Sequence, residues 1–118
     1  MNFLTLARRS ARLADDKKGE DILILNIKKI SSFAEYLLIV TAGSLPQINA
    51  ISENIKKELS NDYGLLPLHR EGRRSESWAV LDYAGLVIHI MSHETRQFYR
   101  LEKLWDKARQ ISFSTSRV

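Results

Sequence analysis

Two histidines and a glycine-serine pair are the residues of this chain whose types and spacing could support chemistry. His89 and His93 lie four apart, which on a helix would put both imidazoles on one face, as in zinc sites. His89 falls within an apolar run typical of a strand and His93 lies beyond its end, so we expect neither a metal site nor a cofactor. The chain has no cysteine, which excludes disulfides and thiol catalysis.

Gly43-Ser44 follows an apolar run and is similar to the glycine-serine turn of nucleotidyltransferases. Those enzymes hold metal ions with spaced carboxylates on the adjoining strands, and no such pair stands near this turn. Ser44 and Gln47 have the spacing of a capping box, so we interpret Ser44 as a helix N-cap. Nucleophile elbows and phosphate-binding glycine loops are also missing from the sequence, which predicts a protein without catalytic activity.

The composition predicts one compact domain. The 118 residues are 44% hydrophobic and 27% charged, with both signs interspersed. We assign residues 1–110 to the domain and 111–118 to a flexible tail. The apolar runs are too short to span a bilayer and the first residues do not form a signal peptide, so we expect a cytoplasmic protein. The net charge of +4 is a mild bias toward an anionic partner.

The periodicity of apolar residues predicts three helices and five extended segments. These are helices 3–17, 44–64 and 94–107, and extended segments 21–27, 35–41, 65–69, 78–83 and 86–91. Residues 70–77 are predicted to form a mobile loop and 110–118 a frayed tail. This order implies an α/β (α+β) fold in which a mixed sheet of about five strands is flanked by helices.

The last two strands read as a hairpin around Ala84-Gly85, with glycine supplying a positive φ angle. The two-residue turn fixes the register and separates two faces. The apolar face, expected to meet the core, carries Ala79, Leu81, Tyr83, Leu86, Ile88 and Ile90. The second face carries Trp78, Val80, Asp82, Val87, His89 and Met91. This mixture fits a protein contact; the alternative is a face covered by a helix, with Asp82 and His89 satisfied internally.

Several ordered segments carry a resemblance to a known family. They are Trp78 to Tyr83, Val87 to Ile90 and Arg96 to Trp105, preceded by Ala34-Glu35-Tyr36, Gly43-Ser44 and His69 with Glu71-Gly72. Over about residues 4–108 the chain resembles the ribosome-silencing factor (Iojap-like) family. It departs from the family pattern at Glu35, where aspartate is usual, and at Ala84, where an acidic residue or glycine is common.

The resemblance implies a nucleotidyltransferase-like fold without the active site. It also implies a partner, the large ribosomal subunit, bound through ribosomal protein L-fourteen. Members are similar in blocking the joining of the small subunit and in lowering translation when nutrients are scarce. A homodimer of the free protein is implied as well, contact with ribosomal RNA is a secondary expectation, and no membrane contact is expected.

Matching the family's motifs residue by residue gives a predicted contact surface with Trp78 as its anchor. Its members are His69, Glu71, Trp78, Asp82, Tyr83 and Tyr99, with Glu35 and Tyr36 as secondary candidates. The predicted helix 94–107 carries an apolar stripe of Phe98, Leu101, Leu104 and Trp105, and Leu101 and Trp105 are expected to pack in the interior. Arg96 and Glu102 are expected to brace the last helix.

Two other functions compete with this prediction. An RNA-binding module would use Arg70, Arg73 and Arg74, in a loop expected to lie beside Lys28-Lys29, and its affinity for RNA would fall steeply with salt. A residual nucleotidyltransferase is suggested by Gly43-Ser44 alone, and magnesium-dependent nucleotide transfer would reveal it.

Overall fold

The computed structural model describes residues 2–71 and 77–113, without the side chains of residues 69–71 and 104. The elements follow the predicted order closely. They are α1 (Phe3–Asp16), β1 (Glu20–Asn26), β2 (Tyr36–Ala42), α2 (Leu45–Tyr63), β3 (His69–Glu71), β4 (Trp78–Asp82), β5 (Leu86–Ser92), α3 (His93–Tyr99), α4 (Leu101–Leu104) and β6 (Arg109–Ile111). No helix in these described ranges is long and apolar enough to cross a membrane.

The strands form one mixed sheet in the order β3-β4-β5-β2-β1-β6. β2 and β5 are parallel, and every other neighbouring pair is antiparallel. Parallel neighbours need a crossover connection, and the chain between β2 and β5 includes α2, which packs on the sheet. The predicted α+β class with a mixed sheet is therefore confirmed, with β6 as a sixth strand.

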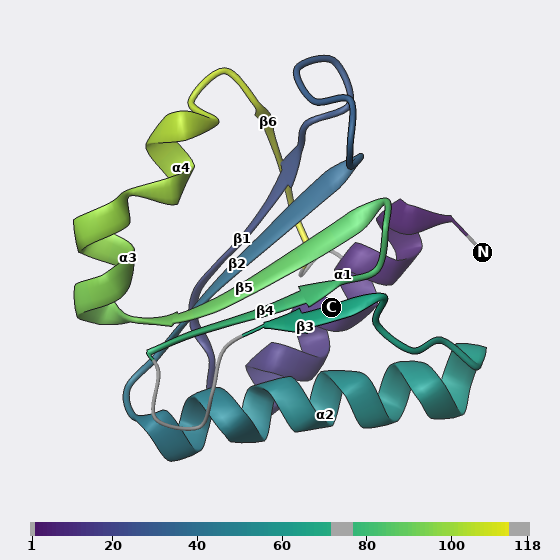
Figure 1. Ribbon diagram of the computed structural model, residues 1–118, viewed down its shortest axis with the longest axis vertical. Coiled ribbons are helices and arrows are strands. Elements are labelled where there is room, and N and C mark those ends of the chain that lie inside the picture. The colour runs from purple at the N-terminus through teal and green to yellow at the C-terminus, as the bar shows by residue number, and fades with distance from the viewer. Residues whose placement is uncertain (1, 72–76, 114–118) are drawn as a thin grey trace.

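The sheet separates two apolar layers of unequal size. On one face, α1 and α2 cover the main core cluster, which includes Ile48, Ile51, Ile55 and Leu59 of α2. On the other face, a smaller cluster around Ile39 and Met91 is covered by Leu101, Trp105 and Ala108. Figure 1 shows α1 and α2 on one side of the sheet and the short helices α3 and α4 on the other.

The predicted hairpin register is confirmed, but the turn differs from the prediction. Trp78 lies opposite Met91, Val80 opposite His89 and Asp82 opposite Val87. Ala84, not Gly85, takes the positive φ of 71°, and its N–H donates to Asp82 Oδ1 at 2.8 Å. Position 85 requires glycine for another reason, because a Cβ there would overlap the Phe3 ring of α1.

The predicted single helix over 94–107 is wrong. Arg100 adopts the left-handed conformation with φ 48°, which ends α3 and starts α4. The break turns Leu101 and Trp105 onto the smaller core cluster, while Phe98 of the same predicted stripe is 79% exposed. The partial burial of these two large side chains offsets the roughly 1–2 kcal/mol that a left-handed residue costs.

Two boundaries also move. The predicted frayed tail begins too early, because β6 pairs with β1 and Phe113 packs against the main core; residues 114–118 lie outside the described part. The predicted extended segment 65–69 becomes a strand only at His69–Glu71, which takes up the first residues of the predicted loop 70–77. Pro67 has no N–H to donate, and pairing starts just after it, where the Leu68 N–H donates to the Asp82 carbonyl at 2.7 Å.

Replacing Ala84 by glycine is expected to stabilise the protein, since glycine tolerates the left-handed conformation that Ala84 adopts. The free energy of unfolding, measured by urea denaturation, should rise by about 0.5–1 kcal/mol. The neighbouring Gly85→Ala is the control and should destabilise, because its Cβ meets the Phe3 ring. An Ala84→Gly protein no more stable than its parent would show that Ala84 is not strained.

Candidate functional site

The hairpin presents two different faces, as the sequence predicts. Its apolar face lies in the main core, where Leu81, Tyr83, Leu86, Ile88 and Ile90 are buried. We call the opposite side the outer face, and it consists of Trp78, Val80, Asp82, Val87, His89 and Met91. Met91 is fully buried in the smaller cluster, whereas the other five side chains are half-buried. The outer face is therefore neither a dry interior nor a fully solvated surface.

Helix α3 extends the outer face with two aromatic side chains. The Tyr99 ring centroid lies 4.8 Å from that of Trp78, and the Phe98 centroid lies 4.9 Å from that of Tyr99. We call Trp78, Tyr99 and Phe98 the aromatic row. It runs outward from the half-buried Trp78 to Tyr99, which is 53% exposed, and Phe98, which is 79% exposed. Exposed aromatic side chains beside a half-buried tryptophan are a composition typical of protein interfaces.

Sequence reasoning missed Phe98 because it assigned the residue to a continuous apolar stripe. A signal was available in the adjacent aromatic pair Phe98-Tyr99. Successive residues of a helix point about 100° apart, so the two rings cannot both face the same underlying layer.

Trp78 is held in place by His89. The Trp78 indole N–H donates to His89 Nδ1 at 2.9 Å, and the two rings lie 5.7 Å apart. This bond requires an unprotonated Nδ1. Burial lowers the pKa of His89 to about 4, so the imidazole is neutral at pH 7 and accepts the bond. His89 thus orients the tryptophan, and its Nδ1 is satisfied within the chain as the alternative interpretation of this face expects.

Three of the predicted contact residues lie on this side of the sheet: Trp78 and Asp82 on the outer face, and Tyr99 on α3 beside Trp78. Asp82 Oδ1 accepts from the Ala84 N–H in the hairpin turn. The His69 backbone pairs with Asp82 and that of Glu71 with Val80, but the side chains of His69 and Glu71 lie outside the described part.

The other three predicted contact residues lie elsewhere. Tyr83 and Tyr36 are buried in the main core cluster, on the opposite face of the sheet. Burial raises the pKa of Tyr83 to about 12, and its hydroxyl has no hydrogen-bond partner among the described residues. Glu35 lies at the hairpin-turn end of the sheet, where its carboxylate is 3.7 Å from the Lys28 ammonium and its N–H donates to the Gly85 carbonyl.

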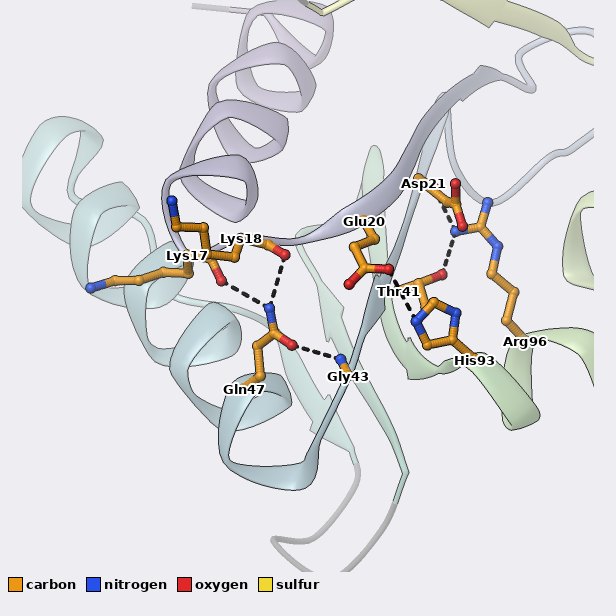
Figure 2. Close-up of polar contacts among 9 residues, drawn as sticks. All are labelled: Lys17, Lys18, Glu20, Asp21, Thr41, Gly43, Gln47, His93 and Arg96. Carbon is orange, nitrogen blue, oxygen red and sulfur yellow. Dashed lines mark hydrogen bonds and ion pairs between the residues drawn. The ribbon is translucent and has the colours of Figure 1, made fainter.

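The turn after β2 is occupied by the chain's own polar groups (Figure 2). Ser44 Oγ accepts from the Gln47 N–H at 3.2 Å, which confirms the predicted N-cap of α2. Gln47 Oε1 accepts from the Gly43 N–H at 2.6 Å, and its amide donates to the carbonyls of Lys17 and Lys18. The Gly43 N–H, which could otherwise meet a phosphate, is therefore already bonded.

The acidic residues near this turn take part in contacts between elements. Glu20 lies 3.1 Å from His93, and the Asp21 carbonyl accepts from Arg96 (Figure 2). Among the side chains that the structure describes, which do not include those of His69 and Glu71, no three histidines or carboxylates are grouped so that they could hold a metal ion.

The predicted arginine loop falls largely outside the described residues, because Arg73 and Arg74 are not described and Arg70 is described only in its backbone, which pairs with Leu81 of β4. The chain is described again from Ser77, whose carbonyl accepts from the Ser92 N–H at the carboxyl end of β5 at 3.0 Å. Lys28 follows β1 at the other end of the sheet, since Asn26 pairs with the first residue of β2.

The fold places this protein in a class of small α+β domains with one mixed sheet. A mixed-sheet α+β domain of the same architecture occurs in a protein of Chromobacterium violaceum, with a TM-score of 0.85 and 26% identity over 98% of this chain and 95% of that one. A structure from Bacillus halodurans superposes with a TM-score of 0.75 and 31% identity over 93% of this chain and 96% of the other.

Sequence relatives then give the family. The ribosomal silencing factor RsfS of Bacillus subtilis is 35% identical over 108 residues, which are 92% of this chain and 91% of that protein. The chloroplastic protein Iojap of Arabidopsis thaliana is 33% identical over 108 residues, 92% of this chain but 44% of its own length. The family model "Ribosomal silencing factor during starvation" matches residues 1–118, and the chain belongs to this RsfS family of non-enzymatic ribosome regulators.

The Trp78–His89 pair predicts a pH dependence of stability. His89 has a pKa of about 4 in the folded protein against 6.5 as its ordinary value. Between these values the unfolded chain binds a proton that the folded chain does not, so the free energy of unfolding falls as the pH is lowered. The loss is complete below about pH 4 and is of the order of 3 kcal/mol.

Urea denaturation of the wild type and of His89→Gln, at pH values from about 7 to about 4, measures this loss. The carboxylates titrate in both proteins, so the difference between the two curves isolates His89. We expect the wild type to lose more stability than the variant over this range. Parallel curves would mean that His89 is not held neutral by the fold.

Proposed function

We propose that this protein silences ribosomes by binding the large subunit through ribosomal protein L-fourteen and blocking the small subunit from joining. The observation that carries the proposal is the aromatic row of Trp78, Tyr99 and Phe98 on the outer face. Membership of the RsfS family supports the same reading. The expected result in the cell is lower translation when nutrients are limiting.

The aromatic row has the properties of a binding anchor. Trp78 is fixed by its bond to His89 before any partner arrives, so little side-chain entropy is lost on binding. Tyr99 and Phe98 are exposed and would bury most of their remaining surface against a partner. Aromatic residues of this kind dominate interface energies, at about 2 kcal/mol or more for each anchor.

The contact set that we propose extends from the aromatic row along β4. Asp82 adds a half-buried carboxylate, and His69 and Glu71 belong to β3, the neighbouring edge strand. Tyr83 and Tyr36 are buried, so their part would be to support the sheet from its other face. Glu35 would contribute from the hairpin-turn end.

Silencing by this route needs bulk and no chemistry. The domain has a radius of gyration of 13.0 Å and extends 32–33 Å along each principal axis. A rigid body of this size on the joining face of the large subunit would keep the two subunits apart by steric exclusion. The same face could instead pair two copies of the free protein, in which case a homodimer would compete with subunit binding.

Co-sedimentation with purified ribosomal subunits tests the proposal. We expect binding to large subunits alone and fewer joined ribosomes when the protein is added. Phe98→Ala and Tyr99→Ala should each weaken binding by about tenfold, and Trp78→Ala by more, because each removes an aromatic anchor. Phe98 is 79% exposed, so its truncation should leave the free energy of unfolding within about 0.5 kcal/mol of the wild type.

Phe33→Ala is the matched control. It is the same substitution at a side chain that is 67% exposed, but on the segment between β1 and β2, where its ring contacts Trp105 and is not part of the aromatic row. Its affinity for the large subunit should equal that of the wild type. Absence of large-subunit binding by the folded wild type would refute the proposed function. Equal binding by the Phe98, Tyr99 and Trp78 variants would refute the outer face as its site.

A further inference from the structure

Helix α3 carries two of the three rings of the aromatic row, yet apolar burial does not hold it. None of its seven residues, all of them described, is buried. Its first turn is fixed by polar contacts, because Ser92 Oγ accepts from the Thr95 N–H and the Ser77 and Thr95 hydroxyls are hydrogen-bonded. The left-handed Arg100 then separates its end from α4. Something else must set the position of its last turn.

Arg96 supplies that attachment. Its side chain is only 12% exposed and reaches across the sheet (Figure 2). Nη1 donates to the Asp21 carbonyl of β1 at 2.6 Å and to Thr41 Oγ1 of β2 at 2.8 Å. Nε donates to Glu102 Oε2 of α4 at 3.0 Å. One guanidinium therefore connects α3 to two strands and to the next helix.

The planar guanidinium is suited to this role. It presents donors in fixed directions, so three bonds to three elements restrict both the distance and the rotation of the helix. Two of the acceptors lie in the sheet: Thr41 is 1% exposed, and the Asp21 carbonyl belongs to an irregular turn of β1 with φ 46°. A lysine carries the same charge but has one nitrogen, so it cannot reproduce the geometry.

Tyr99 follows Arg96 by three residues, which is nearly one helical turn, so both side chains lie on neighbouring parts of the same helix face. Arg96 reaches toward β1 and β2, whereas Tyr99 packs on Trp78 of β4. Helix α3 thus contacts strands on both sides of β5. Arg96 attaches it to β1 and β2, and Tyr99 attaches it to Trp78 of β4. Loss of the arginine bonds would free the helix to shift relative to Trp78.

We infer that Arg96 is a positioning residue for the binding surface. It holds α3 so that Tyr99 packs on Trp78 and Phe98 packs on Tyr99. This inference rests on the proposed function, because the surface is the one proposed to bind the large subunit. Arg96 itself faces the sheet and makes its contacts within the chain, so its effect on binding is indirect.

The test compares Arg96→Lys and Arg96→Gln with the wild type in two measurements. The first is the indole N–H signal of Trp78 in a nitrogen-proton NMR spectrum, assigned with Trp78→Phe; the Trp105 indole reports separately on α4. The second is affinity for purified large subunits. We expect the Trp78 signal to shift or broaden in both variants and affinity to fall by about tenfold in both.

Arg109→Gln is the control for lost charge, because Arg109 is exposed on the edge strand β6 and the ribosome is polyanionic. It should leave the Trp78 signal unchanged and weaken binding less than Arg96→Gln does. Thr41→Val removes one acceptor and nearly preserves side-chain shape, so it should give a smaller change of the Trp78 signal in the same direction.

The outcomes distinguish the positioning role of Arg96 from the proposed binding to the large subunit. An unchanged Trp78 signal in folded Arg96→Lys and Arg96→Gln overturns the positioning role. A shifted signal with wild-type affinity overturns it too, since the surface would then not depend on Arg96. A wild type that does not bind large subunits refutes the proposed function, whereas the Trp78 signal still decides whether Arg96 fixes α3.

Discussion

Burial of β2 on both faces is the constraint on which the rest of this structure depends. All seven residues of the strand are buried, and side chains alternate between the two faces of a sheet, so each face needs its own cover. Each large aliphatic side chain contributes about 1.5–3 kcal/mol only when it is fully removed from water. Helices α1 and α2 cover one face completely, and the chain after β5 must cover the other.

The segment that covers the second face is short, and the part of the sheet that it leaves partly exposed is the candidate binding surface. Leu101, Trp105 and Ala108 cover Ile39 and Met91 near the centre of the sheet. Over β4 the covering layer consists of the aromatic row, in which Tyr99 contacts Trp78 and remains partly exposed to solvent. Because α3 buries none of its own residues, polar contacts hold its position, and the surface that we propose for binding therefore depends on an arginine side chain that is 12% exposed.

The polar groups of the turn after β2 serve the fold. Gly43 and Ser44 connect a strand to a helix, and Gln47 bonds the Gly43 N–H and ties the turn to the end of α1. The groups that could meet a ligand serve the interior of the protein instead. Fold and function are separable in this way because a site depends on a few side chains, whereas the fold depends on the whole apolar pattern.

The sequence by itself determined the features that rest on local chemistry. The hairpin register follows from a two-residue turn, the start of α2 from Ser44 and its end from Gly64, whose φ is 67°. The two faces of the hairpin, and with them Trp78 and Asp82 as outer-face residues, were likewise predictable, because alternation along a strand needs no knowledge of the rest of the chain.

Tertiary structure alone decided what depends on segments far apart in sequence. Packing against β2 and β5 broke the last helix at Arg100 and left Phe98 exposed, and pairing with β1 turned Arg109–Ile111 into a strand. The Phe3 ring of α1 fixed glycine at position 85 and the positive φ fell on Ala84. Periodicity records which residues share a face of one element, but not which neighbour covers that face, so burial of Tyr36 and exposure of Tyr99 required the assembled fold.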